Sequence, residues 1–147
     1  MNPALLALSA LLSTPSPAPT AVSVSADVQI DVGHAQWASF PDLRPAPRNL
    51  PTGAMLTRVE SILKDDECEM RGQSHRRFDI TVPWLVQVEP DGRLSRLVVA
   101  DMGCRPLEVY VATLVVALAQ RGDIRPATSA EPRIYASEFN FNLTTIR

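Results

Sequence analysis

Hydrophobic and polar residues alternate in three segments of the chain, and this period of two is typical of β-strands with one buried face. The alternation predicts strands over residues 27–32, 78–88 and 134–143. In the third segment one side is mainly aromatic and is expected to be buried. The opposite side carries Ala136, Glu138, Asn140 and Asn142.

A tight turn follows the second of these segments and predicts a β-hairpin. Asp91 and Gly92 form the turn after Pro90, and Gly92 supplies the positive φ that such a turn needs. Residues 93–100 return as the second strand, with Leu97 and Val99 on one face and Leu94 and Val98 on the other. Pro83 has no backbone N–H, which places its part of the first strand at an edge or a bulge.

Two further segments have the hydrophobic spacing of helices. Residues 53–64 carry one apolar stripe, and Thr52 is a suitable N-cap. Residues 107–119 are nearly all apolar, which predicts a helix that is buried over most of its circumference. Pro106 at its start and Gly122 beyond its end mark its limits. The predicted order is therefore helix, hairpin, helix, strand.

The residues before the first helix are of two kinds. Residues 33–51 contain four prolines and show no clear period, which predicts an extended linker. Trp37 and Phe40 either pin this linker to the domain or lie exposed in it. The alternating strand of residues 27–32 precedes the linker, and we expect it to add a strand to the sheet.

The first 26 residues contain no charged side chain and predict a secretory signal peptide. Their apolar run, residues 4–12, is too short to cross a bilayer, which needs about 20 residues. Small residues at positions 24–26 suit cleavage, and Ala21 is a competing site. A disordered cytoplasmic tail or a wrongly assigned start remains as an alternative. The chain then divides into a signal peptide (1–26), an N-terminal strand with a proline-rich linker (27–51) and a folded domain (52–147).

The chain has two cysteines, Cys68 and Cys104, which allow a single disulfide. By loop-closure entropy such a bond stabilises a fold by about 4 kcal/mol, and an oxidising periplasm makes the pairing the default expectation. Two unrelated thiols are the alternative. His34 and His75 show no ligand spacing to either cysteine, so we expect neither a metal nor another cofactor.

Charge and motifs argue against two classes of function. The chain has 16 acidic and 14 basic residues, and this net charge of −2 disfavours general nucleic-acid binding. His75, with Ser74 and Asp79 nearby, is the best candidate for a small hydrolase. Neighbours along a chain rarely form a catalytic triad, however, and no nucleophile elbow, zinc-protease motif or phosphate-binding loop occurs. We therefore expect that the chain is not an enzyme. The acidic residues around Cys68 are interpreted as a solvated loop.

The ordered series of elements over about 90 residues resembles the carboxy-terminal domain of TonB, the periplasmic energy-transducing protein. The resemblance lies in the strand that ends at Asp91 and Gly92, its return strand, the helix that begins near Leu107 and the closing strand with Phe139 and Phe141. It implies an α+β fold in which two helices pack on a three-stranded antiparallel sheet, with the N-terminal strand as a potential fourth. We hypothesise that this fourth strand covers the edge of the closing strand.

The same resemblance implies a binding function. In that family the last strand is an edge that pairs with an extended motif of outer-membrane receptors, by strand addition. Here the partner-binding edge consists of Ile134, Ala136, Glu138, Asn140 and Asn142. The expected partner is a protein, such as a segment of an outer-membrane receptor in a Gram-negative bacterium; a homodimer through the edge strand is also compatible.

Two departures from the family argue against energy transduction. The transducers begin with a membrane-spanning helix and carry a long spacer, whereas residues 33–51 reach about 65 Å at most. The two cysteines are also outside the usual transducer pattern. We therefore expect a periplasmic or secreted, disulfide-bonded relative. A structural or inhibitory envelope protein of the same fold, with no transducing role, remains as the alternative.

Overall fold

The computed structural model describes residues 23–43, 51–64, 68, 79–124, 126 and 129–143. The described part contains the strands and helices β1 (Ser23–Gly33), α1 (Gly53–Leu63), β2 (Asp79–Val88), β3 (Arg93–Ala100), α2 (Arg105–Gln120) and β4 (Arg133–Asn142). A short 3-10 helix, η1 (Trp37–Ser39), lies between β1 and α1. These bounds confirm the predicted order of helix, hairpin, helix and strand. Most of the predicted signal peptide lies outside the described residues.

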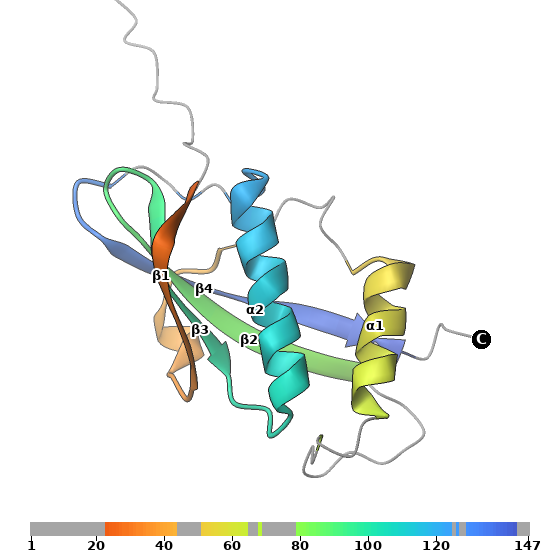
Figure 1. The fold of residues 1–147 in the computed structure, drawn as a ribbon. Coiled ribbons are helices and arrows are strands. Elements are labelled where there is room, and N and C mark those ends of the chain that lie inside the picture. Colours follow the sequence, from red (N-terminus) through yellow and green to blue (C-terminus); the bar gives the residue numbers. More distant parts are fainter. Residues whose placement is uncertain are drawn as a thin grey trace, which may run out of the picture.

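The four strands form one mixed sheet in the order β1-β3-β2-β4 (Figure 1). β2 and β3 are the predicted hairpin, β4 pairs antiparallel with β2, and β1 pairs in parallel with β3. Both helices lie on one face of the sheet, where α2 contacts β1 and β3 and α1 contacts β4. The fold is α+β, with two helices packed on a sheet, as predicted.

The predicted fourth strand is present, but it lies at the edge opposite to β4. Residues 29–33 of β1 pair regularly with residues 96–100 of β3. Val28 packs against the main core, on the face that carries α2. Because α2 packs against both β1 and β3, the hydrophobic side of β1 is covered by α2 when β1 lies beside β3. The hypothesis that the N-terminal strand covers the edge of the closing strand is therefore wrong.

The main core lies between the sheet and the two helices. Phe139 has ring-centroid distances of 5.8 Å to Trp84 and to Phe141, so the buried sides of β2 and β4 meet as predicted. α2 is more exposed than predicted, since Val109 is half exposed on its outer side. The largest fully buried side chains of the described residues include Trp84, Phe141, Ile80, Leu94, Leu97 and Leu107.

A β-bulge changes the predicted facing of one residue in β3. Gln87 pairs with Arg96 while Val88 pairs with Leu94, so Ser95 is an extra residue in the ladder. The bulge shifts the side-chain alternation by one. Leu94 therefore lies in the main core beside Leu97, and the prediction that it shares the opposite face with Val98 is wrong.

Pro83, predicted to lie at an edge or a bulge, is instead found in an inner strand, at a point where one of the two neighbouring ladders has ended. β2 is an inner strand of the sheet, but its pairing with β3 begins only at Trp84. Pro83 pairs with Glu138 of β4 and lies where the β3 ladder has ended. The missing N–H of Pro83 therefore breaks no ladder bond of the β2–β3 pair.

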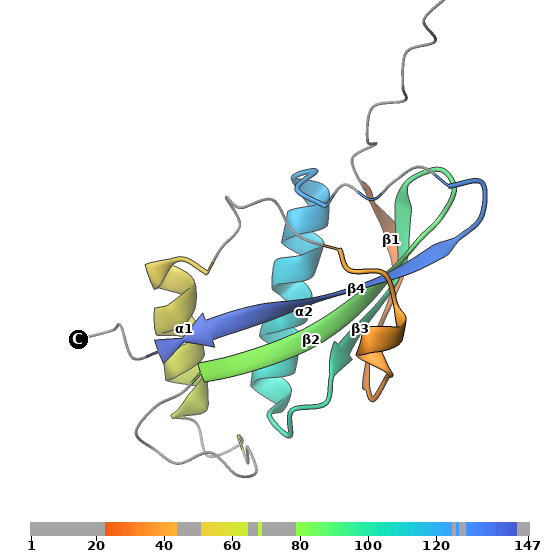
Figure 2. The ribbon, with the colours of Figure 1, turned by 180° about the vertical axis from the view of Figure 1, so that it is seen from behind.

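The reverse face of the sheet carries a smaller apolar cluster, over which the segment with η1 runs (Figure 2). Leu85, Val98 and Ala136 are buried there, and Trp37 and Phe40 pack against them. The two aromatic side chains therefore pin this segment to the domain, one of the two alternatives left open by the sequence. The prediction of an extended linker is wrong for residues 37–39, which form η1, whereas Asp42 is extended and forms a β-bridge.

Side chains close the helix ends. Thr52 is the N-cap of α1, as predicted, and its hydroxyl oxygen accepts the Met55 N–H at 3.3 Å. Glu108 is 3% exposed, and its carboxylate accepts the N–H groups of Met102 and Cys104, at 2.8 and 3.3 Å, at the start of α2. Gly122, with φ of 73°, follows the end of α2.

The predicted disulfide joins Cys68 to Cys104 across 36 residues of sequence, with a Cα–Cα distance of 4.3 Å. Cys104 is fully buried and is the N-cap of α2, so the bond ties the segment after α1 to the start of α2. Within the described residues, no helix is long and apolar enough to cross a membrane.

The hairpin turn is held by one carboxylate. Asp91 accepts the backbone N–H of Arg93 at 3.1 Å and its Nε–H at 2.6 Å, and Gly92 has φ of 81°. The Glu89 and Arg93 backbones close the loop with a bond of 2.9 Å. The backbone N–H of Arg93, followed by its side chain, lowers the pKa of Asp91 below its usual value.

Acid is expected to weaken this turn. Because the pKa of Asp91 is lower in the folded chain than its unfolded value of about 3.9, the ionised carboxylate contributes stability at neutral pH, and this contribution is lost as the pH falls through the folded pKa. An NMR titration of the Asp91 carboxyl carbon should give a midpoint below 3.9, and Arg93→Gln should leave it lowered, since the backbone donor remains. A midpoint at or above the usual value would contradict this.

Candidate functional site

Every second residue of β4 points its backbone N–H and C=O away from β2. In an antiparallel ladder these groups alternate between the partner strand and the opposite side. Both backbone groups of Ala136 bond to the segment of residues 41–43 and therefore face outward. The uninterrupted register between β2 and β4 gives the same direction to every second residue on either side of Ala136. We call this set the β4 edge: Ile134, Ala136, Glu138, Asn140 and Asn142.

The middle of the β4 edge is already paired with an extended segment of the same chain. Asp42 forms a parallel bridge with Ala136. The Leu43 N–H donates to the Ala136 oxygen at 2.6 Å, and the Ala136 N–H donates to the Pro41 oxygen at 2.9 Å. We call residues 41–43 the strap. It is visible in Figure 2, where the orange chain that leaves η1 passes β4 on the near side of the sheet.

One buried side chain holds the strap in place. Leu43 is 5% exposed and belongs to the main core, whereas Pro41 and Asp42 are exposed. Phe40, just before the strap, packs on the reverse face against the cluster that includes Ala136. The strap is thus fixed by two main-chain bonds and by apolar contacts at both of its ends.

Beyond the strap, the β4 edge is exposed and polar. The side chains of Glu138 and Asn140 are exposed, and no backbone partner for their outward N–H and C=O groups is found among the described residues. Their side chains form a chain of bonds: the Thr81 hydroxyl donates to Asn140, whose amide donates to Glu138 at 3.0 Å. A polar surface of this kind keeps an edge strand soluble while its backbone stays accessible.

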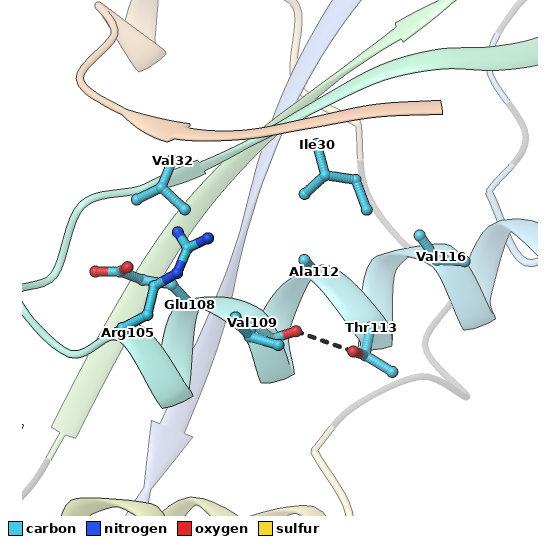
Figure 3. Close-up of a pocket in the computed structure, with 8 residues that line it drawn as sticks. All are labelled: Ile30, Val32, Arg105, Glu108, Val109, Ala112, Thr113 and Val116. Atoms are coloured by element: carbon cyan, nitrogen blue, oxygen red, sulfur yellow. Dashed lines mark hydrogen bonds between the residues drawn. The ribbon is translucent and has the colours of Figure 1, made fainter. Parts of the chain in front are cut away.

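A second surface feature lies at the other end of the sheet, between β1 and α2 (Figure 3). It is a groove of about 390 Å³, lined mainly by aliphatic side chains. Ile30 of β1 and Val109 of α2 are each about half exposed there, and they are the large hydrophobic residues that the described part of the chain leaves most open. Arg105, Glu108 and Thr113 are the polar residues of this lining. The Glu108 carboxylate already accepts the N–H groups of Met102 and Cys104, and the Thr113 hydroxyl donates to the Val109 oxygen at 2.9 Å.

The remaining predicted sites are not assembled in the described residues. His75 lies outside them, Asp79 is exposed at the start of β2, and no group of three or more His, Cys, Asp or Glu residues that could hold a metal ion occurs among them. His34 is exposed and lies 3.8 Å from Asp101. Of the predicted groupings, the described residues bring together the β4 edge, the hairpin turn of Asp91 and Gly92, and the disulfide.

The strap was not predicted from the sequence. The sequence gives only a weak indication of it: Leu43 is one of two large aliphatic residues in a proline-rich stretch, and it stands three residues after Phe40. The structure shows that this leucine and the two aromatic residues before it are the anchors of the whole segment.

No protein-family model, curated protein or solved structure matches the chain.

Proposed function

We propose that this chain is a protein-binding module related to the carboxy-terminal domain of TonB, and that it binds extended protein segments by strand addition to the β4 edge. The observation that carries the proposal is the strap: the edge already holds an extended segment through two main-chain hydrogen bonds. In strand addition such bonds supply the affinity, and pockets for alternate side chains supply the selectivity.

The polar part of the β4 edge supports the same function. Glu138 and Asn140 present outward backbone groups beside exposed, hydrogen-bonding side chains. A partner strand that continues past the strap would pair with these backbone groups between exposed polar side chains. Binding of this kind requires no catalytic group, and we propose a binding module rather than an enzyme.

The proposed location is outside the cytoplasm, after removal of the signal peptide. The intramolecular disulfide is compatible with an oxidising compartment. In the periplasm, segments of outer-membrane receptors are the partners that the resemblance to TonB favours. We propose no energy transduction, because the predicted spacer is short.

Site-specific cross-linking tests the proposal. A photoreactive phenylalanine analogue replaces Asn140 in the full chain, expressed in a Gram-negative host, and the matched control replaces Thr113, an exposed residue of α2. We expect light to attach an outer-membrane protein to position 140 and not to position 113.

Two outcomes contradict the proposal. Attachment of soluble proteins alone at position 140 would favour the structural or inhibitory alternative over receptor binding. Attachment at position 113 only, or at neither position, would remove the β4 edge as the binding site.

A further inference from the structure

We propose that the strap is a self-ligand of the β4 edge that a partner segment displaces. The partner is an extended protein segment, parallel to β4, that carries a large aliphatic side chain in the place of Leu43 and has no proline at the second and fourth positions after it. This inference rests on the proposed function, because it names the regulation and the ligand chemistry of the same edge.

The direction and side-chain pattern of the partner follow from the strap itself. Asp42 lies opposite Ala136 in a parallel bridge, and its side chain is exposed. The next residue, Leu43, places its side chain in the main core. A segment that replaces the strap therefore needs a large aliphatic residue there, since an unfilled site would leave a cavity in the core, whereas the residue before it is free to be polar.

Two prolines limit how far the chain's own segment can pair with the edge. The Leu43 N–H bonds to the Ala136 carbonyl, so in a continued parallel ladder the N–H groups of residues 45 and 47 would serve the carbonyls of Glu138 and Asn140. Both residues are prolines, which have no N–H. A partner with other residues at these positions can form two hydrogen bonds that residues 45 and 47 cannot form.

The strap therefore combines an advantage with a handicap. Because it is part of the same chain, its effective concentration at the edge is high, on the order of millimolar for a short tether. A free segment must compete with it, so its apparent affinity is its intrinsic affinity multiplied by the fraction of molecules in which the strap is released. The two extra bonds let a proline-free segment win this competition where the chain's own sequence would not.

Binding of two matched peptides to the full chain tests the inference. The first peptide has the sequence of residues 39–48 with alanine in place of both Pro45 and Pro47, and the second has the natural sequence; each carries a fluorescent label for anisotropy. The proteins are the natural chain, Leu43→Ala, which loosens the strap, and Leu56→Ala, which makes the same truncation in α1 against the same core.

We expect the alanine peptide to bind Leu43→Ala at least tenfold more tightly than the natural chain or Leu56→Ala. On Leu43→Ala, the peptide of natural sequence should bind at least tenfold more weakly than the alanine peptide. A third peptide, with a methyl group on the nitrogen of its leucine, should lose binding, because that nitrogen donates to the Ala136 oxygen.

The inference is overturned if the alanine peptide binds all three proteins equally, if the two peptides bind Leu43→Ala equally, or if no peptide binds Leu43→Ala. These results are independent of the cross-linking experiment. The expected peptide pattern without a cross-linked outer-membrane protein would uphold the displaceable strap and contradict the proposed receptor binding. Cross-linking at position 140 without the peptide pattern would uphold receptor binding and contradict the displaceable strap.

Discussion

Replacing both cysteines with alanine is expected to lower the free energy of unfolding by about 4 kcal/mol. The bond closes a loop of 36 residues, so its loss gives the unfolded chain many more conformations. Cys104 is also fully buried at the start of α2, where the N–H of the same residue bonds to Glu108. The loss should therefore loosen the docking of α2 as well as the loop.

Urea unfolding followed by circular dichroism measures this effect. The natural chain under a reducing agent should match the double variant under oxidising conditions, and the reducing agent should not change the variant. A variant within about 1 kcal/mol of the oxidised natural chain, well below the usual range for such a bond, would show that the disulfide has little part in stability.

Proline at two neighbouring positions of β4 is expected to have opposite consequences. The Ser137 N–H faces β2, opposite Trp84, so Ser137→Pro removes a ladder bond in the middle of the sheet and should cost about 2–4 kcal/mol. The Glu138 N–H faces outward and has no backbone partner among the described residues, so Glu138→Pro should cost about 1 kcal/mol or less, as for proline on an edge strand.

The pair of variants is its own control, because the same residue is introduced one position apart. Thermal and urea unfolding of both variants give the two costs. Equal costs would contradict the backbone directions assigned to β4, and a larger cost at Glu138 would mean that they are reversed. If the assignment holds, Glu138→Pro should also weaken any partner that pairs beyond the strap.

Local patterns were enough to predict most of the fold. The aromatic side of β4 and the apolar side of β2 follow from a period of two, and Thr52 and Gly122 mark helix ends by their own chemistry. The face of Leu94 was predicted wrongly because one extra residue in the ladder reverses the alternation of side chains. Nothing in Ser95 itself indicates a bulge.

Long-range pairing was beyond the sequence pattern. The period of residues 27–32 identifies a strand but not its neighbour, and its place beside β3 depends on how α2 crosses the sheet. The strap pairs Asp42 with Ala136, which are far apart in the chain, and its two-bond bridge is too short to leave a period. The five residues of the β4 edge were predictable because they share one strand; what occupies that edge was not.

Amide hydrogen exchange along β4 of the natural chain tests the central claim, that this strand presents a partly occupied, accessible edge. We predict slow exchange for the amides that face β2, at Tyr135, Ser137 and Phe139, and intermediate exchange for Ala136, whose N–H bonds to the strap. Glu138 and Asn140 should exchange fastest. If the amides of Glu138 and Asn140 exchange as slowly as that of Phe139, the edge is covered and the account is contradicted.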